Sequence, residues 1–190
     1  MMAVDLCCGA GGMTRGLLAA GFDVLGVDVV AREEYPAPVL VQDVRTLDPS
    51  RLGRPDYIHA SPPCERFSQA RKSRVEDPPN LVDLDILQAC VGIIEDRRPA
   101  YWSIENVRGA VPLFSTILGP PRLKHGPYFF WGNFPPFLVG SSGMRKKMQQ
   151  GGKAGVQGHR SPWLRAMVPA GIAEPLAHAV AAAVQIQEGT

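Results

Sequence analysis

Short apolar runs separated by glycine- and proline-rich breaks divide the first part of the chain. Each run has the length and composition of a buried strand, and the runs lie at 3–7, 22–28, 38–42, 56–60 and 101–104. Apolar residues recur at helical spacing after the first run, at 13–20, and before the last, at 81–97. Strands that alternate with helices predict a mostly parallel sheet flanked by helices, the α/β class.

The pattern weakens after residue 108. We expect a helix at 109–118, an apolar strand at 128–131 and an alanine-rich helix that ends near residue 185. Residues at about 140–162 are rich in glycine, glutamine, lysine and arginine, which predicts a basic loop. A chain of 190 residues suits one domain with a proper core, so we expect a single domain over residues 1–190.

Composition excludes several classes of protein. Hydrophobic residues make up 45% and charged residues 20%, as in ordinary globular proteins, and no apolar run approaches the ~20 residues that span a bilayer. The first predicted strand begins without a preceding charged segment or cleavage site, so we expect no signal peptide. The cysteines, at positions 7, 8, 64 and 90, fit neither a disulfide framework nor a zinc site. These features predict a cytoplasmic protein without a bound metal, in which Cys90 belongs to the core.

The net charge of +2 conceals an uneven distribution. Residues 1–105 carry 16 acidic and 11 basic residues, whereas residues 106–173 carry nine Lys/Arg and no acid. So long a basic stretch indicates a surface that faces a polyanion such as nucleic acid. A solvated basic surface is the alternative interpretation.

A glycine turn, Cys8-Gly9-Ala10-Gly11-Gly12, joins the first predicted strand to the first predicted helix. This context is typical of a nucleotide-type loop, in which glycines let the backbone approach a ligand closely. Asp28 ends the second strand, 19 residues after Gly9, at the spacing of a carboxylate that binds ribose hydroxyls. Asp43 ends the third strand, where it can meet an adenine edge.

Two phosphate-binding loops are excluded at this turn. No Gly-Lys-Ser/Thr follows the glycines, as a P-loop requires, and the third glycine of a dinucleotide pattern would fall on Thr14. An adenosine ligand without a pyrophosphate fits better, and S-adenosylmethionine is such a ligand.

The run at 56–60 ends at Ser61-Pro62-Pro63-Cys64. Two consecutive prolines stop a strand, because neither has an N–H for the ladder and each fixes its own φ. They present Cys64 at the carboxyl end of a strand, the edge of an open α/β sheet where ligands bind. Taken alone, this motif is equally typical of an ordinary loop cysteine.

The glycine turn, Pro62-Pro63-Cys64 and Glu105-Asn106-Val107, in this order and each at a predicted strand end, resemble motifs of the DNA cytosine-5 methyltransferase family. The resemblance covers roughly the first 110 residues and implies a Rossmann-like class I fold that uses S-adenosylmethionine. Methyltransferases of exocyclic amines carry an aromatic residue where this chain has Cys64. The resemblance implies cofactor contacts at Cys8, Gly9, Gly11, Gly12, Asp28, Asp43 and Pro62.

The resemblance also assigns two catalytic roles. Carbon 5 of cytosine is too weakly nucleophilic to attack a methyl sulfonium, and addition of the Cys64 thiolate at carbon 6 makes it enamine-like. Glu105 would hydrogen-bond or protonate ring nitrogen N3 as electrons move toward it. A purely structural strand-end carboxylate is the alternative interpretation of Glu105.

The chain departs from the family after residue 108. Gly126 and Pro127 stand near the place where a Gln-x-Arg-x-Arg pattern supplies an arginine to the target base, so Arg122, Lys124 and His125 remain alternatives for that role. Only about 30 residues stand where the family has a target-recognition domain, too few for a separate core. We therefore expect a catalytic core with minimal sequence recognition and a possible protein partner that supplies specificity. The residues expected to bind nucleic acid are Arg66, Ser68, Arg108, Arg122, Lys124, Arg145, Lys146 and Lys147.

The resulting prediction is a DNA cytosine-5 methyltransferase of the restriction–modification type. It would act on a cytosine flipped out of double-stranded DNA through a covalent cysteine adduct. Two alternatives remain open at this stage. The same parts could act on a tRNA cytosine, or the chain could be a catalytically weak nucleic-acid-binding subunit that needs a partner. The presence of both Cys64 and Glu105 argues against the second alternative.

Overall fold

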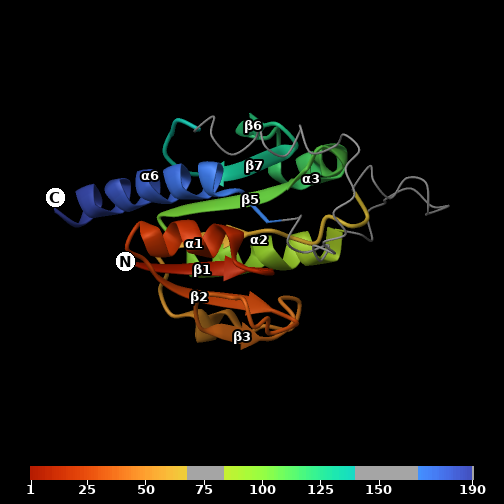
Figure 1. The fold of residues 1–190 in the computed structure, drawn as a ribbon. Coiled ribbons are helices and arrows are strands. Elements are labelled where there is room, and N and C mark those ends of the chain that lie inside the picture. The colour runs from red at the N-terminus through yellow and green to blue at the C-terminus, as the bar shows by residue number, and fades with distance from the viewer. Residues whose placement is uncertain (68–83, 140–166, 190) are drawn as a thin grey trace, which may run out of the picture.

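The computed structural model describes residues 1–67, 84–139 and 167–189. In this part of the chain the strands form one sheet in the order β3-β2-β1-β4-β5-β7-β6 (Figure 1). The strands β1 to β5 are parallel to one another, whereas β7 runs antiparallel to both β5 and β6. Their bounds are β1 (Met2–Leu6), β2 (Asp23–Asp28), β3 (Val39–Val41), β4 (Tyr57–Ala60), β5 (Tyr101–Val107), β6 (Leu123–His125) and β7 (Tyr128–Asn133). The mostly parallel α/β sheet predicted from the sequence is confirmed.

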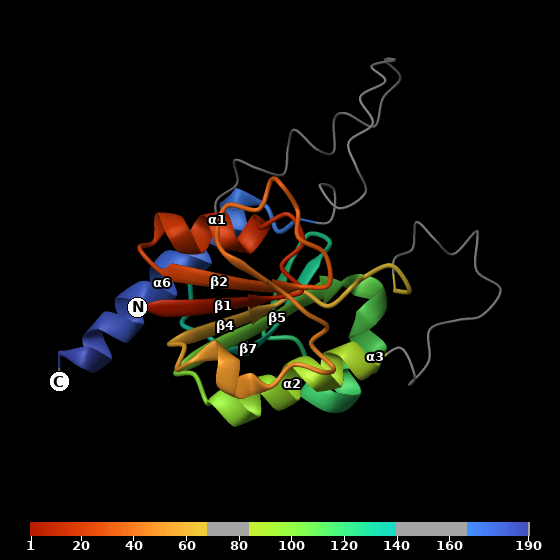
Figure 2. The ribbon, with the colours of Figure 1, turned by 90° about the horizontal axis from the view of Figure 1, so that it is seen from below.

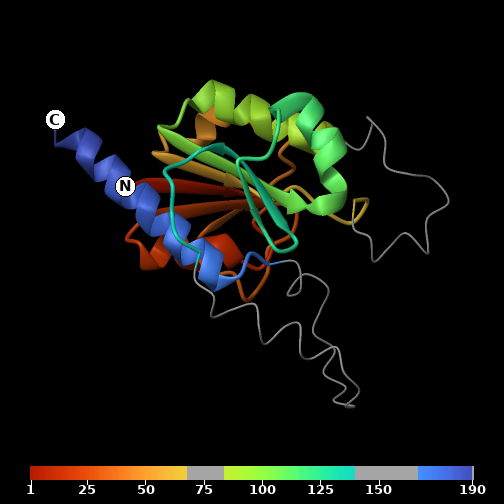
Figure 3. The ribbon, with the colours of Figure 1, turned by 90° about the horizontal axis from the view of Figure 1, so that it is seen from above.

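Helices cover both faces of this sheet. On one face lie α1 (Gly12–Ala19) and α6 (Ala170–Glu188), and on the other lie α2 (Asp85–Arg97) and α3 (Val111–Leu118) (Figures 2 and 3). Short 3₁₀ turns, η1 (Pro49–Leu52) and η4 (Arg108–Ala110), follow β3 and β5. The result is a three-layer arrangement in which the sheet is buried between two pairs of helices.

Each layer of helices closes its own apolar core. On the α1/α6 face, Leu17 and Leu176 pack over sheet residues such as Phe130. On the α2/α3 face, the buried residues include Leu87, Cys90, Phe114, Ile58 and Ile104. Cys90 is fully buried there, as the sequence predicted.

The C-terminal helix packs directly on the first helix of the chain. A Cβ added at Gly16 would lie 2.6 Å from the main-chain carbon of Ala173, so α1 and α6 approach more closely than any side chain at residue 16 would allow. This packing, together with the approach of Val168 to Gly12, places the start of α6 beside the glycine turn that precedes α1.

Near the edge of the sheet one predicted strand is corrected and another is confirmed. The strand predicted at 101–104 continues to Val107, because Glu105, Asn106 and Val107 pair with β7. Glu105 therefore lies inside β5 and not beyond its end. The strand predicted at 128–131 is confirmed as β7, which continues to Asn133. The preceding strand β6 was not predicted, and Gly126, at φ 58°, lies in the turn of the β6–β7 hairpin.

Helix boundaries also differ from the predictions. The segment 109–118 begins as η4 and becomes helical at Val111, and the C-terminal helix extends to Glu188. The helix expected at 81–97 is observed from Asp85 onward, and residues 81–83 lie outside the described residues.

Candidate active site

Cys64 lies on the turn that follows β4, and Glu105 lies in the neighbouring strand β5. The register pairs Ala60 with Ile104, so Ser61 stands level with Glu105. The Ser61 hydroxyl donates a hydrogen bond to Oε2 of Glu105 at 3.3 Å. The parallel pairing of β4 and β5 thus brings the two predicted catalytic residues to one edge.

Cys64 is a half-buried free thiol. Burial raises the pKa of the Cys64 thiol above its ordinary value, and the nearby carboxyl of Glu105 raises it further. The second contribution disappears when Glu105 is protonated, because a neutral carboxylic acid does not repel a thiolate. The thiolate of Cys64 is therefore favoured when Glu105 carries a proton.

Glu105 is only 6% exposed. Burial raises the pKa of Glu105 to about 8, against the opposing effect of the Ser61 hydrogen bond. At neutral pH the carboxyl group is mainly protonated, which is the state that can give a proton to a base. The pKa of Tyr128 in β7 rises to about 12. Burial is the main cause, and the negative charges of ionised Glu105 and Cys64 raise it further.

Asn106 connects the cysteine turn to β5 from the other face of the sheet. Its Nδ2 donates to the main-chain carbonyl of Pro62 at 2.9 Å, and its Oδ1 accepts from the N–H of Val107 at 2.8 Å. Asn106 is completely buried, so its amide is held in one orientation. The sequence motif contains this residue, but only the structure gives it a role.

The glycine turn has the left-handed backbone that its glycines permit. Gly9 has φ 53° and Gly11 has φ 77°, and Gly11 immediately precedes α1. A Cβ added at Gly9 would meet nothing within 4 Å, so there is room beside this backbone. Asp28 lies at the turn as predicted: Oδ2 accepts from the N–H of Gly9 at 2.9 Å and Oδ1 from that of Val30 at 3.1 Å.

Three other residues predicted to touch a cofactor have contacts within the protein. A Cβ at Gly12 would lie 2.8 Å from the Val168 carbonyl oxygen, so helix packing explains this glycine. Both carboxylate oxygens of Asp43 bind Arg45, which also reaches Asp85. Burial raises the pKa of Cys8 well above its ordinary value, which keeps this thiol protonated.

A buried hydrogen-bonded group that the sequence reasoning missed lies behind the glycine turn. Thr14 Oγ1 donates to Asp5 Oδ2 at 2.5 Å, and the Tyr35 hydroxyl lies 2.8 Å from the same Thr14 oxygen. Because the Thr14 hydrogen is used on Asp5, Tyr35 donates to Thr14. Burial raises the pKa of Asp5 to about 7. Tyr35 comes from residues 29–38, which form turns between β2 and β3, and no sequence signal placed it there.

The predicted nucleic-acid-binding residues are spread over several places. Arg66 is half-buried on the cysteine turn, and Arg108 is exposed in η4, just after β5. The remaining predictions at Ser68, Arg145, Lys146 and Lys147 fall outside the described residues. The structure therefore describes the basic stretch only in part.

The hairpin register separates the three candidates for a base-contacting cation. His125 pairs with Tyr128, which pairs with Val107, so His125 shares the face of Glu105 at the carboxyl end of β5. Lys124 points to the opposite face, with Nζ 5.8 Å from the centroid of the Phe129 ring.

Arg122 lies before β6, with its guanidinium carbon 5.1 Å from the Phe134 ring centroid. It thus stands toward the end of β7 that is farther from the carboxyl edge of β5. Of the three candidates, His125 is therefore the one that the register places on the face of Glu105.

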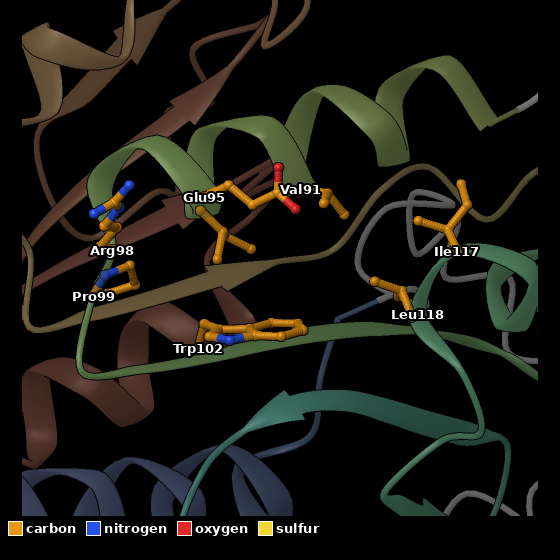
Figure 4. Close-up of a pocket in the computed structure, with 8 residues that line it drawn as sticks. Val91, Glu95, Arg98, Pro99, Trp102, Ile117 and Leu118 are labelled. Atoms are coloured by element: carbon orange, nitrogen blue, oxygen red, sulfur yellow. The ribbon is translucent and has the colours of Figure 1, made fainter.

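A cavity of about 360 Å³ lies elsewhere in the protein, over the first half of β5 between α2 and α3 (Figure 4). The Trp102 ring lies along the strand there. Glu95 of α2 and Arg98, which caps the C-terminal end of that helix, lie above the ring. Trp102 pairs with Asn133, at the end of β5 opposite to Val107. This cavity is therefore separate from the edge that carries Cys64.

Two kinds of site are absent from the part of the chain that the structure describes. No three His, Cys, Asp or Glu side chains gather there in a way that would hold a metal ion. Nor does any helix within the described ranges combine the length and apolar character needed to cross a bilayer.

Curated relatives match about 60% of this chain. The Type II methyltransferase M.AgeI of Thalassovita gelatinovora is 30% identical over an alignment of 129 residues, and the match covers 60% of this chain and 29% of the relative. M.DdeI of Desulfomicrobium norvegicum is 29% identical over an alignment of 125 residues, with the same coverage of 60% of this chain and 29% of the relative. The matches thus span less than a third of the length of these two relatives.

A solved structure supports the fold. The crystal structure of a protein assigned as a DNA modification methyltransferase, encoded within an E. coli prophage, superimposes with a TM-score of 0.51. It is 20% identical in sequence, and the match covers 70% of this chain and 46% of that one. At this identity the likeness shows the fold alone, and it agrees with the Rossmann-like class I methyltransferase fold predicted from the sequence.

The family model for C-5 cytosine-specific DNA methylases matches residues 1–113, which include the glycine turn, Cys64 and Glu105. Dependence on S-adenosylmethionine, predicted for this chain, is a property of that class of enzyme. Because the match covers more than half of the chain and agrees with the resemblance seen in its motifs, the chain belongs to the C-5 cytosine-specific DNA methylase family.

Proposed function

We propose that this protein transfers a methyl group from S-adenosylmethionine to carbon 5 of a cytosine in DNA. The observation that carries the proposal is that a half-buried free thiol, Cys64, on the turn after β4 lies at the same edge as a buried, protonatable carboxyl group, Glu105, in the adjacent strand β5. A nucleophile for carbon 6 and an acid for N3 are the two groups that this chemistry requires.

The cofactor fits the glycine turn. Gly9 leaves open space beside its backbone, and Asp28 presents a carboxylate at the end of β2, where ribose hydroxyls find an acceptor. When bound, S-adenosylmethionine supplies an electrophilic methyl group on a sulfonium. Asp43 would have to release Arg45 to contact an adenine, so we place the cofactor first against Gly9 and Asp28.

The residues act in a defined order. The Cys64 thiolate forms a bond to carbon 6, the electrons of the ring move toward N3, and N3 takes the proton from Glu105. Carbon 5 thereby becomes the nucleophilic carbon of an enamine and accepts the methyl group. Loss of the carbon 5 proton to a base and departure of the thiolate restore the aromatic ring, and N3 returns its proton to Glu105.

The electrostatics of the pair suit this order. The productive state contains a thiolate at Cys64 and a neutral carboxyl at Glu105. A pKa of about 8 keeps Glu105 protonated at neutral pH, and the neutral form no longer raises the pKa of Cys64. Protonation of Glu105 and ionisation of Cys64 therefore support each other.

Double-stranded DNA with the cytosine flipped out of the helix is the proposed substrate. The matched family is that of C-5 cytosine-specific DNA methylases, and the stretch 106–173, without acidic residues, provides cations for phosphates. Phosphate contacts supply affinity more than specificity. We therefore propose that sequence recognition depends on a partner protein or on segments beyond the catalytic core.

A covalent trap tests this function. A duplex with 5-fluorocytosine and S-adenosylmethionine is expected to give a stable protein–DNA adduct, because fluorine at carbon 5 cannot leave as a proton does. Cys64→Ala should give no adduct, whereas Cys90→Ala, which removes a fully buried thiol of the core, should retain it. A parallel 5-fluorocytosine RNA stem-loop distinguishes an RNA substrate. The proposal is overturned if no duplex is trapped or if the adduct persists without Cys64.

A further inference from the structure

A row of hydrogen-bonded polar side chains crosses β4 and β5 and ends at Glu105. The Tyr57 hydroxyl lies 2.5 Å from Ser103 Oγ, which lies 2.7 Å from His59 Nδ1. On the other side of the ring, His59 Nε2 lies 2.9 Å from Ser61 Oγ, which donates to Glu105 Oε2. Alternation along the strands places all five side chains on the face covered by α1 and α6.

This row lies in the interior of the sheet. Tyr57, His59 and Ser103 have no exposed surface, and the Phe130 ring lies with its centroid 6.5 Å from that of His59. Polar groups buried at this depth are retained when each has a partner, and every member of the row has one. His59 contacts the cysteine turn through Ser61, whereas the hydrogen bonds of Tyr57 and Ser103 stay within β4 and β5.

The direction of the hydrogen bonds follows from the number of protons. His59 is neutral, because burial lowers the pKa of its ring to about 3, so the ring carries a single N–H. Ser61 uses its only hydrogen on Glu105, so it must accept from His59, and the N–H of the ring is at Nε2. Nδ1 is then an acceptor, which makes Ser103 a donor to His59 and leaves Tyr57 to donate to Ser103.

We propose that His59 is a positioning residue for the acid of the reaction. Its Nε2–H holds the Ser61 hydroxyl as a donor to Oε2 of Glu105, so the proton destined for the base resides on Oε1. The row from Tyr57 through Ser103 fixes the tautomer of His59. This inference rests on the proposed function for its catalytic meaning, but its structural content is independent of methyl transfer.

Among residues 1–67, 84–139 and 167–189, few titratable groups lie on the face of Glu105 and near it. They are Cys64 on the turn after β4, His59 in β4, Tyr128 in β7 and, by register two strands away, His125 in β6 and Asp5 in β1. Tyr128 remains protonated through the neutral range, since its pKa is about 12. The hydrogen bonds that lead from Ser103 to Glu105 run through His59 and Ser61, so we expect these two residues to carry any change in the titration of Glu105 when the far end of the row is broken.

The tautomer of His59 can be observed directly by ¹⁵N NMR of protein labelled in histidine. The triple variant His125→Gln, His159→Gln, His178→Gln leaves His59 as the only histidine, so its signals need no further assignment. We expect a neutral ring from pH 5 to 8, with the proton on Nε2 throughout. A proton on Nδ1, or a ring that ionises in this range, would overturn the proposal whether or not the protein methylates DNA.

The coupling to Glu105 is tested by ¹³C titration of its carboxyl group, assigned by its absence in Glu105→Gln. Ser61→Ala should raise the midpoint by about one pH unit, the scale of a hydrogen bond to a carboxylate. Ser103→Ala frees the His59 tautomer, so the midpoint should move in the same direction although Ser103 has no bond to Glu105. Ser115→Ala, whose hydroxyl has no partner, is the matched control. An unchanged midpoint in Ser103→Ala would show that the row does not act on the acid.

Discussion

Asn106 and Pro62 are joined by a hydrogen bond of 2.9 Å from a side-chain amide to a main-chain carbonyl. The bond ties the turn that carries Cys64 to the strand that carries Glu105. It lies on the α2/α3 face, whereas Glu105 points to the α1/α6 face, because successive residues of a strand point to opposite sides. The distance between nucleophile and acid is thus fixed from behind the site.

Removal of this bond should slow the reaction without preventing cofactor binding. Asn106→Ala leaves the Pro62 carbonyl unpaired and the cysteine turn free to shift, and a displacement of about 1 Å costs on the order of 10²-fold in rate. Adduct formation with the 5-fluorocytosine duplex should fall by at least about 10-fold, with calorimetric binding of S-adenosylmethionine unchanged. Asn133→Ala removes the same kind of bond, to the Ala100 carbonyl, from an exposed place and should react normally. Equal rates in the two variants would argue against this role for Asn106.

The pH dependence of methyl transfer should report the ionisation of Glu105. Its pKa is raised from 4.5 to about 8, so the proton is present below that pH and is lost above it. The single-turnover rate is therefore expected to fall as pH rises through about 8. Glu105→Gln should lose this descending limb and react about 10²-fold or more slowly, since glutamine cannot supply a proton. A limb that persists in the glutamine variant would assign it to another group.

Asp28 should determine the affinity for S-adenosylmethionine. Replacing Asp28 by alanine removes a charged acceptor, and the cost of such a hydrogen bond is about 1.5–3 kcal/mol. Asp23→Ala is the matched control, because Asp23 is an exposed acid at the opposite end of the same strand. Calorimetry should show weaker binding only in the Asp28 variant. An unchanged dissociation constant would place the ribose elsewhere.

Asp5 should make the protein less stable as pH rises. Its pKa is raised by burial from 3.8 to about 7, so between these values the unfolded chain releases a proton that the folded chain retains. The free energy of unfolding then falls with rising pH by at most about 1.4 kcal/mol per unit for this group. Asp5→Asn cannot ionise but keeps an acceptor for Thr14. The free energy of unfolding of this variant, relative to that of wild type, should therefore increase by on the order of 1–4 kcal/mol between pH 4 and pH 7. The measurement is urea denaturation of both proteins at several pH values. The same dependence of the free energy of unfolding on pH in the two proteins would contradict this prediction.

Glycine has opposite roles in two helices. At Gly16 a Cβ would approach the Ala173 backbone, so Gly16→Ala should force α1 and α6 apart and destabilise the protein by about 1–3 kcal/mol. At Gly92, exposed on α2, a Cβ would meet nothing, so Gly92→Ala should stabilise it by about 0.5–1 kcal/mol. Thermal denaturation of both variants measures the difference. If Gly16→Ala left the stability unchanged, α6 would have to pack less tightly on α1 than described.

Local chemistry was sufficient to predict much of this protein. Strand ends, glycine turns and the stop imposed by Pro62 and Pro63 depend on neighbouring residues, so the sequence alone indicated the βαβ order and the places of Cys64 and Asp28. The family followed from the same short motifs. Alternation also held a signal that was not used: Tyr57 and His59 share one face, as do Ser103 and Glu105 on the next strand.

Tertiary structure decided what depends on residues far apart in the chain. Pairing with β7 extends β5 past Ile104, which moves Glu105 from a strand end into the sheet interior, where burial raises its pKa. The hairpin register, and not the composition of the basic stretch, places His125 on the face of Glu105. Gly12 serves the packing of the segment before α6, some 150 residues later, which no local pattern could indicate. Each of these relationships is a non-local contact, and its partner is defined only when the sheet and the C-terminal helix are assembled.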